Sequence, residues 1–189
     1  MKQLILIKLI QRLATDYDKK IFKLSELAIL TGESQAAVGM ALGRAEREGI
    51  VAHVRHYWIN MMERPRLEDV ALEIMSPSYI SFESALYHHG VLSQSPRGAL
   101  TLATMGKPAM VVTPLGNIQS IHLQPGLFFG FDDHRMAHPE KAFLDMIYIR
   151  IRKGIGEITE TIYRDELNQA VLRRLSKKYP TYVQKALQN

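Results

Sequence analysis

The sequence has no cysteine among its 189 residues, which excludes disulfide bonds and thiolate metal sites. Such a composition suits a reducing compartment, so we expect a cytoplasmic protein. Long apolar runs are also missing. None approaches the roughly 20 residues that a transmembrane helix needs, so we expect no contact with a membrane. The first segment, MKQLILIKLIQRL, is interrupted by Lys8 and is followed by no small-residue cleavage site, which favours a folded helix over a signal peptide.

Recognisable catalytic signatures are absent as well. The sequence contains no nucleophile elbow, no glycine-rich phosphate loop and no paired catalytic carboxylates. We therefore expect neither an enzyme nor a bound cofactor.

Histidine and carboxylate side chains offer one alternative, a divalent metal site, because both are ordinary ligands. The residues in question are His88, His89, Asp132, Asp133, His134, His138 and Glu140. Their spacing matches no ligand motif, and adjacent histidines on a helix point to different faces. We expect polar residues of loops and helix ends here, with Glu140 as a first-turn acid that the helix dipole favours, and no metal.

The net charge is basic, at +5, and it is unevenly spread. Residues 1–66 carry 11 basic and 7 acidic side chains, an excess that is typical of a phosphate-binding module. A second basic run lies near the C-terminus and comprises Arg173, Arg174, Lys177 and Lys178. We expect a solvated helix face there, and a surface for phosphate or for an acidic partner is the alternative.

Apolar periodicity and capping signals predict a winged helix-turn-helix at the N-terminus. The expected elements are a helix over 2–14, a strand over 21–24, helices over 26–30 and 35–48, and strands over 50–54 and 57–60. Ser25 and Ser34 are the expected N-caps, and Gly49 supplies a left-handed stop. The predicted core of this module comprises Leu27, Ala28, Leu30, Val38, Leu42, Ala45 and Ile50.

Beyond residue 60 the pattern changes. The segment over 61–69 is predicted as a linker or the start of a connecting helix. The elements expected after it are a helix over 82–90 capped by Ser81, strands over 99–103, 109–113, 118–123 and 127–131, a helix from Pro139, and a tail helix broken by Pro180. The predicted fold class is α+β. A winged helix-turn-helix over 1–64 precedes a small α+β domain over 65–189, with an antiparallel or mixed sheet and C-terminal helices.

The outward face of the helix over 35–48 is predicted to enter the major groove of DNA, which an α-helix fits. Lys23, Arg44, Arg47 and Arg55 are expected to contact phosphates, and Gln35 and its neighbours to read bases. The full set of candidate DNA-binding residues is Lys23, Ser34, Gln35, Ala36, Gly39, Met40, Arg44, Arg47, Arg55 and His56. The small residues allow close approach but carry few hydrogen bonds, so we expect modest direct readout. A winged helix that binds protein instead is the alternative.

Two phrases of the second half, YISFESALYHHG over 79–90 and PEKAFLDMIY over 139–148, complete the pattern. Together with the N-terminal module they resemble AbiEi-type antitoxins of type IV toxin-antitoxin systems, over nearly the whole chain. The resemblance implies a protein that represses its own operon by binding double-stranded DNA at its operator. It also implies that the C-terminal domain opposes a cognate nucleotidyltransferase-like toxin. An inverted-repeat operator would favour a dimer, and the sequence does not specify the oligomeric state.

Overall fold

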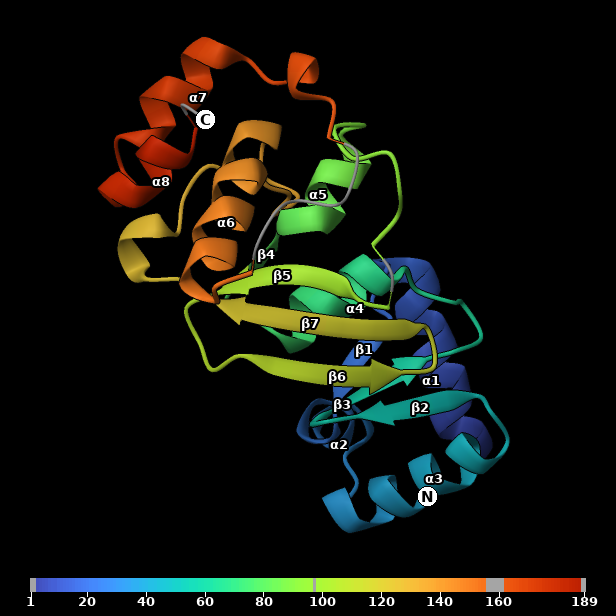
Figure 1. Cartoon of the computed structure of the whole chain (residues 1–189). Helices are drawn as coiled ribbons and strands as arrows, with labels where there is room; N and C mark the ends of the chain where they lie inside the picture. The colour runs from blue at the N-terminus through green and yellow to red at the C-terminus, as the bar shows by residue number, and fades with distance from the viewer. Residues whose placement is uncertain (1–2, 97, 156–161, 188–189) are drawn as a thin grey trace. The chain divides into compact units, whose positions relative to one another are not determined.

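The structure, a computed structural model, describes residues 3–96, 98–155 and 162–187 (Figure 1). Within these residues the chain forms eight α-helices, two short 3-10 helices and seven β-strands arranged in two sheets. The predicted α+β class is therefore confirmed. No helix in the described ranges combines the length and the apolar character that crossing a bilayer requires.

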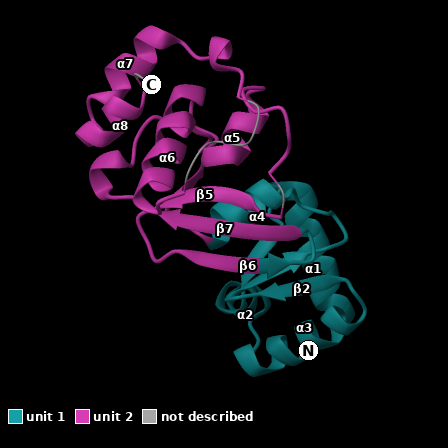
Figure 2. Cartoon of the chain, viewed as in Figure 1, with its two compact units in different colours: residues 1–74, 112–115 teal, residues 75–111, 116–189 magenta. Residues whose placement is uncertain are grey.

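The chain divides into two compact units (Figure 2). Unit 1 holds residues 1–74 and 112–115, and unit 2 holds residues 75–111 and 116–189. The domain boundary between residues 64 and 65 stays a prediction.

Unit 1 follows the element order that the sequence predicts. Its elements are α1 (Gln3–Tyr17), β1 (Ile21–Lys23), α2 (Leu24–Thr31), α3 (Gln35–Arg47), β2 (Val51–Val54), β3 (Tyr57–Asn60) and α4 (Leu67–Ile74). The three strands form an antiparallel sheet in the order β1-β3-β2. Gly49 has a φ of +71° just after α3, as expected of a left-handed stop.

Two details of α2 differ from the prediction. The helix begins at Leu24, so Lys23 rather than Ser25 occupies the N-cap position, where the Glu26 carboxylate accepts the Lys23 backbone N–H at 2.8 Å. Leu30, predicted in the core, is 53% exposed. The inward stripe of this helix runs through positions 24, 27, 28 and 31, and residue 30 falls outside that spacing.

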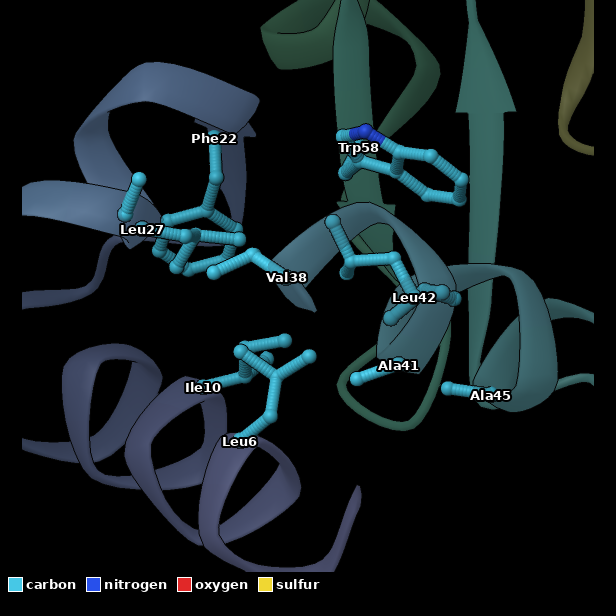
Figure 3. Close-up of a cluster of buried hydrophobic side chains, with 11 residues drawn as sticks. Leu6, Ile10, Phe22, Leu27, Val38, Ala41, Leu42, Ala45 and Trp58 are labelled. Carbon is cyan, nitrogen blue, oxygen red and sulfur yellow. The ribbon is translucent and has the colours of Figure 1, made fainter. Parts of the chain in front are cut away.

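The core of unit 1 is built around the inner face of α3 (Figure 3). Four residues of this helix are buried, namely Val38, Ala41, Leu42 and Ala45. They belong to one apolar cluster with Leu6 and Ile10 of α1, Phe22 of β1, Leu27 and Ala28 of α2, Val51 of β2 and Trp58 of β3. Because every earlier element and the hairpin contribute to this cluster, the orientation of α3 about its own axis is set by packing.

Unit 2 contains the second sheet and the remaining helices. Its elements are β4 (Ser78–Ile80), α5 (Phe82–His88), β5 (Leu100–Thr104), β6 (Ala109–Thr113), β7 (Gly116–His122), η1 (Pro125–Leu127), α6 (Pro139–Arg152), η2 (Arg164–Glu166), α7 (Gln169–Ser176) and α8 (Thr181–Ala186). The sheet order is β4-β5-β7-β6, with β4 antiparallel and β7 parallel to β5. The last two residues of β6, 112 and 113, are assigned to unit 1. The sheet is therefore mixed, one of the two predicted arrangements. Helix α5 packs on β5, α6 packs on α5, and α7 and α8 pack on α6 (Figure 1).

Unit 2 differs from the prediction in three places. The strand expected over 127–131 is an irregular segment after η1, because its aromatic rings are used for packing rather than for a ladder: Phe128 and Phe131 lie against Tyr79, and Phe129 against Lys141. Strand β4 was not predicted. Ser81 stands at the N-cap of α5, but its hydroxyl bonds to Asp145 and does not cap the helix.

Candidate nucleic-acid interface

The N-terminal end of α3 is shaped by a short turn and a side-chain cap. Gly32, with a φ of +67°, ends α2, and Ser34 starts α3 after a single intervening residue. The Ser34 hydroxyl accepts the backbone N–H of Ala37 at 3.2 Å, as the sequence predicts for an N-cap. Gln35 and Ala36 follow directly and are both exposed.

The face of α3 opposite the core carries small and exposed residues. Met40 is 64% exposed, and Arg47 is also exposed. A Cβ atom at Gly43 would meet nothing within 4 Å, and one at Gly39 would meet only the Leu24 side chain, at 4.0 Å. Packing inside unit 1 therefore does not demand glycine at either position. Because glycine has no side chain beyond Cα, another molecule can approach the helix backbone closely along this face.

Two arginines border this face at its C-terminal end. Arg47 is exposed and Arg44 is half-buried, and among the described residues neither guanidinium has a hydrogen-bonding or ionic partner. The nearby acids are engaged elsewhere: Glu46 accepts the backbone N–H of His53 at 3.0 Å, and Glu48 accepts from the side-chain amide of Gln3 at 2.8 Å. Both arginines are left available to an external anion.

The turn of the β2-β3 hairpin places two more basic side chains at the surface. Arg55 and His56 form the turn, and both are exposed. Arg55 has a φ of +58°, in the left-handed region that disfavours residues with a Cβ atom by about 1 kcal/mol or more. A residue in this region stores backbone strain, a feature that is enriched at functional sites. The Glu46–His53 hydrogen bond ties this hairpin to α3.

Lys23, the remaining predicted phosphate contact, lies at the end of β1. It is exposed, and its ammonium stands 5.5 Å from the ring centroid of Tyr57, in the neighbouring strand β3. All ten predicted residues thus lie in unit 1, on α3 or at its N-cap, in the hairpin turn, or at the junction of β1 with α2. Their role in binding DNA stays a prediction.

A second concentration of polar groups lies inside unit 2, and sequence reasoning missed it. Lys141 and Asp145, one turn apart on α6, form a fully buried ion pair. The Lys141 ammonium also donates to the hydroxyls of Tyr79 and Tyr179, each at 2.8 Å. The Asp145 carboxylate accepts from Tyr79 at 2.9 Å, from Ser81 at 2.8 Å and from Tyr179 at 2.7 Å. These five side chains are the buried polar cluster.

The buried polar cluster is closed. Lys141, Asp145 and Ser81 have no exposed surface, and their donors and acceptors are satisfied by one another and by the two tyrosines. Burying an ion pair costs several kcal/mol per charge, and such hydrogen bonds are what offset that cost. The arrangement can hold α6, β4 and the C-terminal helices together, but it offers a substrate no access. Its one sequence signal is a Lys and an Asp four residues apart, with only apolar and aromatic residues between them and over 146–149.

The histidines and acids considered for a metal site are dispersed. Within the described ranges, no group of three or more His, Asp or Glu side chains is arranged to hold an ion. His89 bonds the Ala137 carbonyl at 2.8 Å, and the Glu140 carboxylate accepts the backbone N–H of Asn168 at 2.8 Å. Glu140 does stand in the first turn of α6.

The ionisation of the two clustered tyrosines yields a first prediction. Burial raises the pKa of Tyr79 and Tyr179 above the usual range, and the Asp145 carboxylate raises it further. Their contribution to stability is therefore present below about pH 10, the pKa of the unfolded chain, and is lost as the pH rises beyond it. In an alkaline titration followed by phenolate absorbance, both are expected to ionise only as the protein unfolds.

Two variants check this assignment. Tyr179→Phe is expected to reduce the amplitude of the late, unfolding-linked step. Tyr17→Phe, at an exposed position of α1, leaves that amplitude unchanged. A late step of equal size in wild type and Tyr179→Phe contradicts the assignment.

A matched pair of glycines gives a second prediction. Gly130 has a φ of +74°, and a Cβ there would lie 3.2 Å from Cγ of Lys141. Gly154 has a φ of +63°, and a Cβ there would meet nothing within 4 Å. Gly130→Ala is expected to lower the free energy of unfolding by about 1–3 kcal/mol more than Gly154→Ala does, because only the first crowds the buried polar cluster. Urea denaturation measures both, and equal losses would exclude the crowding.

Comparison with known proteins adds information on the fold. No family model matches the chain, and no curated protein matches it. Among solved structures, it is similar to the crystal structure of the RV2827C protein from Mycobacterium tuberculosis, with a TM-score of 0.56 and 14% sequence identity. The match covers 93% of this chain and 72% of that one. At this identity the likeness is one of fold alone.

Proposed function

We propose that unit 1 is a winged helix-turn-helix that binds DNA, and that the protein is a cytoplasmic transcriptional autorepressor and antitoxin of the AbiEi type. The observation that carries the DNA-binding part is the outer face of α3, open along its length and bordered by Arg44 and Arg47 without internal partners. A helix with such a face fits the major groove.

Contacts of two kinds are assigned to this face. Gln35, in the first turn of α3, reaches a base edge, and the small surfaces of Ala36, Gly39 and Gly43 let the helix backbone approach the groove. Phosphates on either side are contacted by the cations at positions 23, 44, 47 and 55, which set the orientation of the helix without reading sequence.

The antitoxin part rests on the two phrases that resemble AbiEi-type proteins. They supply four of the five side chains of the buried polar cluster: Tyr79 and Ser81 come from the first phrase, and Lys141 and Asp145 from the second. The phrases therefore have a physical meaning, since they maintain the fold of unit 2. We assign to this unit the action against a nucleotidyltransferase-like toxin.

One observation favours a second candidate, an adaptor whose winged helix binds protein. Ile29 and Leu30 of α2 are 81% and 53% exposed, and Met40 of α3 is 64% exposed. Large exposed apolar side chains of this kind are typical of protein contacts. The adaptor predicts no specific affinity for DNA.

Binding of the full chain to its own upstream DNA, measured across a salt series, separates the two candidates. Arg55→Gly is expected to reduce the salt slope by about one phosphate contact, and glycine readily adopts the left-handed backbone of this turn. Gln35→Ala is expected to lower the preference for the operator over unrelated DNA by about 1–3 kcal/mol.

The control is Arg64→Gly, which removes an exposed arginine with a φ of +37° from the segment before α4. Like Arg55→Gly, it removes one positive charge and places glycine at a residue with a positive φ. It is expected to leave the salt slope unchanged. Absence of specific binding at every salt concentration would refute the repressor and favour the adaptor.

The antitoxin role has a separate test in cells. Co-expression of the chain with a nucleotidyltransferase-like protein encoded beside it is expected to restore growth that this toxin arrests. Arg44→Gln combined with Arg47→Gln is expected to restore growth as well, because neutralisation is assigned to unit 2. Growth arrest that persists with the wild-type chain counts against an antitoxin.

A further inference from the structure

Helix α7 and the two residues after it carry a concentrated positive charge. Arg173 and Arg174 lie in the last turn of α7, and Lys177 and Lys178 follow its end. All four are exposed. These four residues are the α7 basic face. No aspartate or glutamate occurs between residues 167 and 187.

This arrangement is unfavourable for the helix itself. Positions 173 and 177 are four apart, and Lys177, the C-cap, still has helical dihedral angles, so these two like charges repel each other. The negative end of the helix dipole favours one or two cations in the last turn, which accounts for Arg173 and Arg174 but not for a further pair. The nearest acids in sequence, Asp165 and Glu166, lie in η2, before the N-terminal end of α7.

Internal partners do not neutralise the α7 basic face. Arg173 donates to the Gln169 carbonyl of its own helix at 3.3 Å, and the Lys178 ammonium stands 4.2 Å from the ring centroid of Phe129. Arg174 and Lys177 have no side-chain partner among the described residues. Four positive charges therefore face solvent with no acid beside them on the helix.

Helix α7, which carries the α7 basic face, is anchored to the rest of unit 2 by buried contacts and hydrogen bonds. Leu172 and Ser176 on the other side of α7 are buried. The start of the helix is held by Glu140, which accepts the Asn168 backbone N–H. Its end is held by Tyr179, the residue after Lys178, which belongs to the buried polar cluster. Because the helix backbone is already held in place, less conformational entropy is lost when its cations bind a partner.

We propose that the α7 basic face binds the sugar-phosphate backbone of nucleic acid, as a second contact independent of unit 1. The other exposed residues of α7 are Gln169 and Ala170, so the helix offers no apolar anchor of the kind that protein partners use. A phosphate backbone needs only cations, and the release of its counterions supplies the binding free energy. This second contact adds sequence-independent affinity to whatever unit 1 selects.

Two double variants of the full chain test the proposal. Arg174→Gln with Lys177→Gln removes two charges from the α7 basic face. Lys107→Gln with Lys153→Gln removes two exposed charges from elsewhere in unit 2, so the change in net charge is the same. The probe is a 30-base-pair duplex, roughly three helical turns long, without operator sequence, and its affinity is measured across a salt series.

The salt slope is expected to fall by about 2 for the first variant, at about 0.9 per lost phosphate contact, and to stay near the wild-type value for the second. Equal slopes in wild type and the α7 variant, or equal losses in the two variants, would overturn the proposal. Loss of binding to a polyglutamate peptide with no change in duplex binding would also overturn it, in favour of an acidic protein partner.

The salt slopes of the α7 variant and its control are also compared in a chain that carries Arg44→Gln and Arg47→Gln. This comparison separates the proposed α7 contact from the proposed function of unit 1. An α7 effect that persists there stands even if operator recognition fails. Operator recognition without an α7 effect leaves the proposed repressor intact and removes only the second contact. Unchanged circular dichroism in all variants confirms folding.

Discussion

The ion pair between Lys141 and Asp145 is the constraint on which unit 2 depends. Two charges without exposed surface are tolerable only when their hydrogen-bonding groups are satisfied, and three further side chains complete them. Those side chains come from β4, from the start of α5 and from the junction of α7 with α8. The pair therefore fixes the strand at one edge of the sheet, the central helix and the C-terminal helices relative to one another, which apolar contacts alone specify less sharply.

In unit 1, stability depends on one face of α3, and the proposed recognition of DNA depends on the other face. The inner face of α3 belongs to an apolar cluster that includes residues of α1, β1, α2 and the hairpin, and the outer face lies outside that cluster. Stability and recognition are thus assigned to separate residues of the same 13-residue helix. The hairpin turn departs from this separation, because Arg55 occupies a strained backbone position at a cost in stability.

Sequence reasoning succeeded where the signals are local. Ser34, Gly49 and the alternation over 50–60 fix the limits of α3 and the hairpin through caps and side-chain periodicity. It failed where distant residues decide. The segment over 127–131 has strand-like composition, but its rings surround Tyr79 and Lys141, which no local pattern reveals. The buried polar cluster was missed for the same reason, since its members lie as far as 100 residues apart in the chain, from Tyr79 to Tyr179. The candidate interface could be predicted from the sequence because, apart from Lys23, its residues lie on one helix, at its N-cap and in one turn.

The position of Tyr179 has a consequence for the order in which the protein can be made. Lys141 has three acceptors, and the last of them along the chain, the Tyr179 hydroxyl, lies 38 residues after it. During synthesis from the N-terminus, the elements around α3 are complete long before that tyrosine emerges, and domains generally fold as they emerge. Throughout this interval Lys141 and Asp145 of α6 lack the hydroxyl of Tyr179. Burying the ion pair is therefore unfavourable until Tyr179 is present. The apolar cluster around α3 thus extends along the chain only to Trp58, whereas the buried polar cluster of unit 2 cannot be completed before Tyr179 has been made.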